Sequence, residues 1–290
     1  MAALLGGAIL VAPMLLLNRT TVGSPLAAGQ PASRHGGAIA LTSNLAPVVP
    51  PPTTTVAPGT STVTVEPGMT VRDVSKEVGS LPGHNAASFA RTAASGAIHS
   101  FYTPIGSDDL EGVLGTGTYD VMPGESDEAI LRAMVVQFSA QAQEAGLTFA
   151  SAAGRGLSVY EILTAASIVQ QEGYIAKNMP GVARVIYNRL SIGKPLQMNA
   201  TVLYPLGQVG GAFTVQDEHV ESPYNSYLHT GLPPTPICTP SLTALRAAMN
   251  PPVGSWLYFN VVNADGTEAF SSTFTGQLAN EKLAQKLGIG

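Results

Sequence analysis

The chain is poor in charged, aromatic and cysteine residues, and each shortage excludes a class of protein. Only 11% of the 290 residues are charged, and the formal net charge is −5. Because no Lys/Arg-rich block occurs, we do not expect a nucleic-acid partner. The single cysteine, Cys238, excludes an intrachain disulfide and cannot form a zinc site alone. The hydrophobic fraction of 45% nevertheless suffices for a folded core, and the length allows about two domains of roughly 100–150 residues.

The amino-terminal segment, residues 1–17, contains no charged or strongly polar side chain. Its length lies at the short limit for a membrane-spanning helix, which needs roughly 17–25 apolar residues. A cleaved signal peptide is one alternative, although the segment lacks a basic n-region and a convincing cleavage site, and a buried helix is another. We expect a transmembrane anchor over residues 1–17.

Residues 18–60 have a different composition. They hold seven of the 22 prolines, including the run Pro50-Pro51-Pro52, and their only charged side chains are Arg19 and Arg34. Such a segment cannot bury enough apolar surface to offset the entropy of ordering the chain. The sequence therefore predicts a disordered Pro/Ala/Thr-rich linker over residues 18–60.

A strand–turn–helix pattern occurs twice within residues 61–152. Val63-Thr64-Val65 alternates as a strand, Glu66-Pro67-Gly68 forms a turn, and Thr70 caps a helix that runs to about Val78. The pattern returns 56 residues later, with Thr118, Val121, Pro123, Gly124, Ser126 and Ile130 matching Thr62, Val65, Pro67, Gly68, Thr70 and Val74. Two similar corners of one small αβ domain explain this repeat. The pattern also resembles the start of a LysM domain, which would bind glycan, so we expect a LysM-like domain over 61–152.

The rest of the chain, residues 153–290, mixes helices and strands around a loop-rich section at 191–240. Ser158 and Glu161 form a capping-box pattern before an apolar helix that ends near Glu172. The other expected elements are helices over 86–94, 127–145, 180–190, 242–249 and 276–287, and strands over 256–262 and 267–271 joined by a turn. The predicted fold class is α+β, with a small αβ domain followed by a mixed α+β domain.

Glu172 is conspicuous because acidic residues are scarce around it. No Asp or Glu occurs from Gly173 to Gln216, and on a helical wheel Glu172 falls at the margin of the apolar stripe. A carboxyl group at the edge of the core is partly desolvated, which raises its pKa toward the range of a general acid. Taken alone, the position fits an ordinary solvated carboxylate near a helix end better.

Several ordered motifs change that interpretation. They are Ala166–Glu172, Val185–Leu190, Gly193–Gln197, Ala200–Tyr204, Ser222–Tyr227, Gly231–Pro234, Trp256–Phe259 and Phe270-Ser271. In this order they resemble the YceG-like family of endolytic murein (peptidoglycan) transglycosylases, also called the MltG type. The resemblance runs from about Ser61 to the carboxyl terminus, weakly before Gly156 and strongly after it. A shorter match, Leu110-Glu111-Gly112, lies near the junction of the two domains.

The resemblance implies a lyase that cleaves between N-acetylmuramic acid and N-acetylglucosamine without water and leaves a 1,6-anhydro end. The family's catalytic glutamate ends the Ala-Ser-Ile-Val-x-x-Glu motif, which makes Glu172 the candidate acid/base and residues 153–290 the catalytic domain. One carboxylate suffices for this route, because the sugar's own C6 hydroxyl attacks, whereas hydrolases normally need a second carboxylate. Family members commonly carry Glu and Asp where Gln170 and Asn199 stand here.

Six further residues are candidates for sugar binding: Gln197, Asn199, Thr201, Tyr224, Asn225 and Tyr227. The first three alternate, which would place them on one face of an extended segment, with turn hydrogen bonds as the alternative. The tyrosines can stack on sugar rings, although packing in the core explains them equally well.

No metal or cofactor is expected. Asp217, Glu218, His219 and Glu221 form the only cluster that suggests a metal, and adjacent ligands on one loop rarely converge on an ion. The resemblance predicts glycan strands of peptidoglycan as the substrate, a single-pass membrane location with the catalytic domain outside the cytoplasm, and glycan-polymerising synthases as partners. The competing hypothesis is a non-catalytic scaffold that binds the cell wall through the repeated pattern. A peptidase or amidase would need a metal set or a nucleophile–base pair, and neither is evident.

Overall fold

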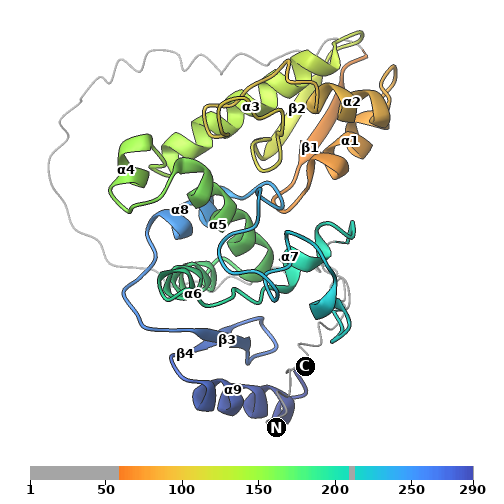
Figure 1. Ribbon diagram of the computed structural model, residues 1–290. Coiled ribbons are helices and arrows are strands. Elements are labelled where there is room, and N and C mark those ends of the chain that lie inside the picture. The colour runs from red at the N-terminus through yellow and green to blue at the C-terminus, as the bar shows by residue number, and fades with distance from the viewer. Residues whose placement is uncertain (1–58, 209–212, 290) are drawn as a thin grey trace, which may run out of the picture. The chain divides into compact units, whose positions relative to one another are not determined.

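The computed structural model describes residues 59–208 and 213–289 (Figure 1). The predicted anchor over 1–17 and all but the last two residues of the predicted linker lie outside the described residues. Within the described ranges, no helix has both the length and the apolar character needed to span a bilayer. Helices combine with two small antiparallel sheets, which confirms the predicted α+β class.

Both copies of the repeated pattern form the elements that the sequence predicts. Strand β1 (Ser61–Val65) is followed by helices α1 (Val71–Gly79) and α2 (Ala86–Ala93), and strand β2 (Gly117–Val121) by helix α3 (Asp127–Glu144). The two strands pair antiparallel, so that the two copies share one sheet. Thr70 caps α1 in a capping box with Asp73, and Ser126 caps α3. Each helix therefore begins where a side-chain oxygen satisfies its first free N–H groups.

The second half of the described chain is built around helix α5 (Val159–Glu172), which begins with the predicted capping box of Ser158 and Glu161. A short helix, α4 (Phe149–Ala153), precedes it and was not expected. Around α5 pack α6 (Met179–Ser191), α7 (Asn199–Leu203) and α8 (Leu242–Met249), while the one-turn helix η1 (Asp217–His219) interrupts the loop-rich section (Figure 1).

The carboxyl-terminal elements form a hairpin covered by a helix. Strand β3 (Tyr258–Val261) pairs with β4 (Glu268–Ser271) in a register that places Val261 opposite Glu268. Helix α9 (Phe274–Lys286) packs on this hairpin. The predicted strand over 256–262 is thus shorter, and the last helix begins two residues earlier than expected.

Two clusters of buried apolar side chains form most of the core, and α5 belongs to both. Ile162, Leu163 and Ala166 join the first cluster, which also contains buried residues of β1, α1, α2, α3 and α8. Ile168 and Val169 join the second cluster, which includes the buried face of α6. The first cluster extends across the predicted domain boundary at 152/153, and the described residues belong to one compact unit. Whether residues 61–152 are a LysM-like domain stays a prediction.

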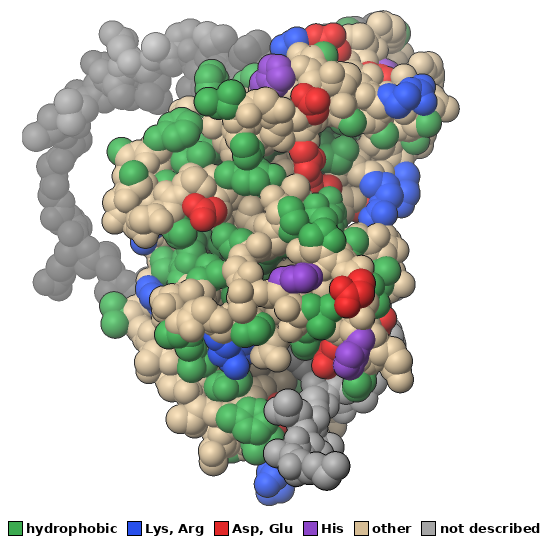
Figure 2. Space-filling view, in the orientation of Figure 1, with side chains coloured by type: hydrophobic (Ala, Val, Ile, Leu, Met, Phe, Trp, Pro, Cys, Tyr) green, Lys and Arg blue, Asp and Glu red, His purple; other side chains and the backbone are tan. Residues whose placement is uncertain are grey.

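Charged side chains are sparse and scattered over the face seen in Figure 2, without a continuous basic area. The absence of a basic area on this face agrees with the composition, because the chain has 14 Lys and Arg residues and 19 Asp and Glu residues.

Candidate active site

Glu172 is the last residue of α5, and its side chain is partly exposed. Its Oε1 accepts a hydrogen bond of 3.0 Å from the backbone N–H of Ala200, in the first turn of α7. Burial raises the pKa of Glu172 to about 7, although the Ala200 N–H and the charge of Arg189 act in the opposite direction. The group therefore holds a proton readily near neutral pH and can also release it, as a general acid/base must.

The chain turns sharply directly after Glu172. Gly173 lies so close to α6 that an added Cβ would be 2.7 Å from Cγ of Met179. Tyr174 then has a φ of 44°, and the N–H of Ile175 donates to the carbonyl of Gly173, which closes a γ-turn around Tyr174. A non-glycine residue in this conformation is strained, and such strain is concentrated at functional sites.

The γ-turn leaves Tyr174 52% exposed beside Glu172. Burial of the phenol and the negative charges of Glu172 and Glu268 raise the pKa of Tyr174 to about 12. Its hydroxyl therefore keeps its proton at neutral pH and can donate a hydrogen bond. The sequence analysis did not single out Tyr174, and its place two residues after Glu172 is the only sequence signal for it.

Arg189 of α6 is buried, as a structural brace would be. Its guanidinium donates to the carbonyls of Leu257, at 2.7 Å, and Leu196, and it lies 5.5 Å from the ring centre of Tyr258. Arg189 acts on Glu172 through its charge, and no ion pair between the two is formed within the described part of the chain.

Asn199 and Tyr227 are hydrogen-bonded to each other at the start of α7, the helix whose first turn contacts Glu172. Asn199 begins α7 and directly precedes Ala200, the donor to Glu172. Its Oδ1 accepts from the Tyr227 hydroxyl, and the Tyr227 ring stacks on Phe213 with a centroid distance of 5.5 Å. The charge of Glu172 contributes, after burial, to a raised pKa of Tyr227, which places this phenol within electrostatic reach of the carboxyl group.

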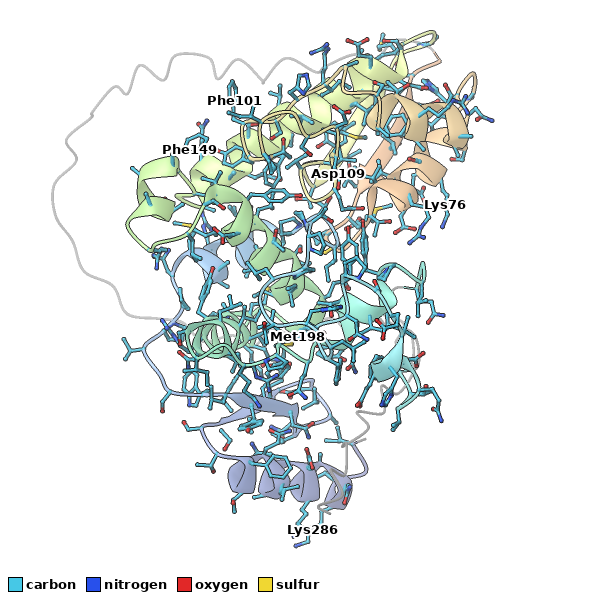
Figure 3. The ribbon with its side chains drawn as sticks, in the orientation of Figure 1. Lys76, Phe101, Asp109, Phe149, Met198 and Lys286 are labelled. Atoms are coloured by element: carbon cyan, nitrogen blue, oxygen red, sulfur yellow. The ribbon has the colours of Figure 1, made fainter. Side chains whose placement is uncertain are left out.

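The expectation of an extended segment through Gln197, Asn199 and Thr201 is wrong, because α7 begins at Asn199. Met198 precedes the helix in an extended conformation and packs in the second core cluster, while Val202 and Leu203 of α7 are buried with Phe213. Figure 3 shows Met198 between α6 and α7. Gln197 is exposed with a φ of 50°, whereas Thr201 is completely buried.

The hydroxyl of Thr201 is engaged within the protein. It bonds the carbonyl of Met198 at 2.7 Å and the hydroxyl of Ser226 at 2.8 Å. Thr201 is therefore used by the protein itself, and Asn199 is the alternating candidate that directly precedes the donor to Glu172.

Asn225 and Tyr224 are likewise used by the protein itself. The amide of Asn225, which is completely buried, donates to the carbonyls of Glu218 at 3.0 Å and Val220 at 2.8 Å. The Tyr224 hydroxyl pairs with Thr235 at 2.9 Å, and its ring packs against Tyr204 at 5.0 Å. These contacts brace the loop beside the site.

A second carboxyl group, which the sequence analysis missed, stands near Glu172. Glu268 of β4 is 6% exposed, and neither carboxyl oxygen has a hydrogen-bond partner among the described residues. Burial, together with the negative charge of Glu172, raises the pKa of Glu268 to about 9. Asp217 and Glu218 were the distant acids considered in the sequence; the acid whose charge couples to Glu172 is Glu268, 96 positions along the chain.

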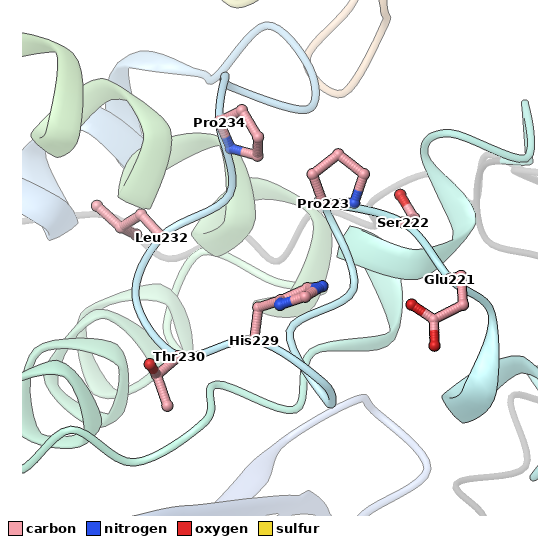
Figure 4. A pocket seen from close by; sticks show the side chains of 7 residues that line it. All are labelled: Glu221, Ser222, Pro223, His229, Thr230, Leu232 and Pro234. Carbon is pink, nitrogen blue, oxygen red and sulfur yellow. The ribbon is translucent and has the colours of Figure 1, made fainter.

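The loop between η1 and α8 lines a pocket of about 510 Å³ that is open to solvent (Figure 4). Its lining residues are Glu221, Ser222, Pro223, His229, Thr230, Leu232 and Pro234. Figure 4 shows the His229 ring directed into it. No group of three or more potential metal ligands is assembled anywhere in 59–208 and 213–289, including at the cluster around Asp217.

Comparisons with known proteins agree with the family resemblance that the sequence motifs indicate. The chain is 34% identical over 166 residues to the endolytic murein transglycosylase of Bacillus subtilis (strain 168), which covers 57% of this chain and 45% of the relative. It is 30% identical over 226 residues to the endolytic murein transglycosylase of Streptococcus pneumoniae (strain ATCC BAA-255 / R6), covering 70% of this chain and 40% of the relative. The chain thus spans less than half the length of the curated relatives it matches.

A solved structure shares the fold. The crystal structure of a Listeria monocytogenes protein described as yceG-like superimposes with a TM-score of 0.65 at 27% identity, covering 78% of this chain and 76% of that one. The profile of the YceG-like family matches residues 45–283. Since this match extends over most of the sequence, the chain belongs to the YceG-like family.

Proposed function

We propose that this protein is an endolytic peptidoglycan lytic transglycosylase with Glu172 as its catalytic acid/base. The observation that carries the proposal is the state of Glu172: a half-buried residue at the end of the family's motif, whose carboxyl pKa burial raises to about 7. The names of the relatives in Bacillus and Streptococcus support the same reaction class.

In the proposed reaction, protonated Glu172 donates its proton to the oxygen that links C1 of N-acetylmuramic acid to N-acetylglucosamine. The C1–O bond breaks, and the departing sugar leaves with a free hydroxyl group. Glu172, now a carboxylate, accepts the proton of the muramic C6 hydroxyl, whose oxygen bonds to C1. The product is a 1,6-anhydro end, Glu172 regains its proton, and no water is consumed.

The groups around Glu172 fit this cycle. The Ala200 N–H and the Arg189 charge stabilise the carboxylate that forms when the proton leaves. Tyr174 and Tyr227 supply phenol groups next to the carboxyl, suited to contact sugar rings and hydroxyls. Asn199, held by Tyr227, carries no charge and therefore cannot act as the base that a hydrolase would need to activate water.

The cellular setting follows from the proposed substrate. A protein that cuts glycan strands acts outside the cytoplasm, and residues 1–17 would anchor it to the membrane there. Glycan-polymerising synthases are the expected partners, and residues 61–152 would add a LysM-like contact to glycan. Membrane fractionation of cells that express the full chain and a variant without residues 1–17 tests this part: recovery of both in the soluble fraction contradicts the anchor.

The reaction itself is tested with purified glycan strands in water enriched in ¹⁸O, followed by mass spectrometry. We expect 1,6-anhydro ends without incorporated ¹⁸O from the wild type and no product from Glu172→Gln. Ends that carry ¹⁸O would identify a hydrolase, and retained activity in Glu172→Gln would refute the assigned role of this residue.

The competing scaffold makes a different prediction in the same experiment. Glycan binding without any turnover, equal in the wild type and Glu172→Gln, would favour a non-catalytic wall-binding protein. Matching thermal melting curves of the two proteins are the required control, since Gln conserves the size of the side chain.

A further inference from the structure

Glu268 faces the part of the molecule that contains Glu172. Side chains two apart in a strand share a face, so Glu268 and Phe270 of β4 point to the same side of the hairpin. Phe270 lies on α6: a Cβ added at Gly181 would be 2.3 Å from the tip of its ring. The Glu268 side chain is therefore on the face of the hairpin that packs on α6.

Asn178, at the start of α6, fixes this arrangement. Its side chain donates to the carbonyl of Gly266 at 2.8 Å and accepts from the Glu268 N–H at 3.2 Å. The hairpin turn also lies on the loop after Glu172, since a Cβ at Gly266 would be 3.7 Å from Ile175. Residues 173–178 thus connect Glu172 and Glu268 through a short, hydrogen-bonded segment.

The charged groups near Glu268 do not neutralise it. Lys177 is paired with Asp265 at 3.0 Å, on the surface of the hairpin turn. Arg189 is held by backbone carbonyls and by the Tyr258 ring. Glu172 supplies a charge of the same sign. A buried carboxylate without a cation or donor costs several kcal/mol by order of magnitude, so the uncharged acid is the favoured form.

An uncharged carboxylic acid has one O–H donor. Among the described residues this donor has no acceptor. A buried polar group without a partner is uncommon in folded proteins, and a ligand that completes its hydrogen bonding is one explanation. A glycan of N-acetylated sugars offers acceptors of this kind, the amide carbonyl oxygen above all.

We propose that Glu268 is a second carboxyl group of the Glu172 site, which donates a hydrogen bond to an N-acetyl carbonyl of the bound glycan. This inference rests on the proposed function. As an uncharged donor, Glu268 orients the sugar without opposing the negative charge that forms on Glu172 when its proton leaves.

Two substitutions separate this role from a structural one. Glu268→Gln keeps a donor of the same size, whereas Glu268→Met keeps the size and removes the donor. We expect Glu268→Gln to retain kcat/KM within about threefold, and Glu268→Met to raise KM about tenfold or more, the loss of roughly one hydrogen bond. Because Met removes an unpaired buried polar group, the melting temperature of Glu268→Met should equal or exceed that of the wild type.

A KM of Glu268→Met within about twofold of the wild type would overturn the proposal, because no sugar contact would then have been lost. Inactivity of both variants with unchanged melting curves would also overturn it, since Glu268 would then exchange a proton in the reaction. Binding of a glycan oligomer, measured in the Glu172→Gln background with and without Glu268→Met, provides a readout independent of turnover. If the wild type yields no product, the proposed function fails; a lower affinity after Glu268→Met would still support the sugar contact, and an unchanged affinity would refute it.

Discussion

At the scale of single residues, the chemistry of Glu172 depends on opposing influences on one carboxyl group. Burial favours the acid form, while the Ala200 N–H and the charge of Arg189 favour the carboxylate. Burial outweighs the other two and places the pKa at about 7, so the group can donate and later accept a proton near neutral pH without a large cost in either direction. Removing one influence should therefore shift its titration in a defined direction.

The pKa of about 7 predicts the pH dependence of both activity and stability. The proposed cleavage of glycan strands begins with protonated Glu172, so kcat/KM should fall as the pH rises through about 7. The folded state binds this proton more tightly than the unfolded chain, in which the pKa has its ordinary value of 4.5. The stability that this group contributes is therefore complete below about pH 4.5 and is lost as the pH rises to about 7.

Glu172→Gln should not lose that stability, and above pH 7 it should exceed the wild type by about 1–2 kcal/mol, allowing for partial exposure. Urea unfolding at pH 5 and pH 8 checks the effect. An equal change with pH in both proteins would contradict the raised pKa.

Asn199 provides a second prediction at this scale. Asn199→Asp places a carboxyl group beside Ala200, the donor to Glu172. Because the resemblance implies a water-free route also for family members that carry Asp here, we expect only anhydro ends without ¹⁸O. The added negative charge should raise the pKa of Glu172, so kcat/KM should fall at a higher pH than in the wild type. Asn199→Ser, which adds no charge, is the control and should keep the pH profile of the wild type. An unchanged pH profile for Asn199→Asp would show that a charge at position 199 does not reach Glu172.

At the scale of secondary-structure elements, the candidate site lies where the end of α5 meets the start of α7, and the loop after α5 connects it to the β3–β4 hairpin. The segment from Gly173 to Asn178 joins them: it turns sharply after Glu172 and ends at the buried amide that holds the hairpin. The position of Glu172 relative to Glu268 consequently depends on Asn178. Its side chain bonds the backbone of the hairpin rather than either carboxyl group.

Asn178→Ala should lower the free energy of unfolding by about 1–3 kcal/mol, because it removes two hydrogen bonds from a buried position. It should also lower kcat, since the hairpin is released from the Glu172 loop. Asn188→Ala is a matched control: the Asn188 side chain likewise makes two hydrogen bonds to the backbone, donating to the carbonyls of Gly254 and Trp256. A similar loss of stability with nearly unchanged kcat is expected there, and equal kcat values for both variants would contradict a specific role of Asn178.

Local signals in the sequence predicted most elements but only part of the site. The caps at Thr70, Ser126 and Ser158 are chemical features of single residues, so their helices could be located without tertiary information. Helix α7 was missed because its alternating polar residues fit an extended segment, whereas burial of Val202 and Leu203 beside Phe213 is visible only in the folded chain. Glu268 was missed because only the docking of the hairpin brings it to Glu172.

At the scale of the whole molecule, the described chain has a core that its sequence units share. Glu111, in the short Leu-Glu-Gly match, is buried and accepts from the N–H of Val71 at 3.2 Å and from the hydroxyl of Tyr204 at 3.1 Å. The turn at Gly68 exchanges backbone hydrogen bonds with the segment before α8, and its carbonyl accepts from the side chain of Gln171. The residue next to Glu172 is therefore tied directly to the first half of the described chain.

This arrangement predicts that the two predicted domains unfold together. Ile162, Leu163 and Leu245 complete the first core cluster from outside residues 61–152, so that segment alone lacks a large part of its apolar packing. In the full chain we expect one transition on heating, with coincident curves from far-ultraviolet circular dichroism and Trp256 fluorescence and a ratio of calorimetric to van't Hoff enthalpy near one. Leu245→Ala, in α8, should lower the free energy of unfolding by about 2–5 kcal/mol and so lower the melting temperature of the whole transition. If instead the isolated segment 61–152 melts cooperatively at the temperature of the full chain, the first half is an independent module, and the hydrogen bonds at Gly68 and Glu111 only dock it against residues 153–290.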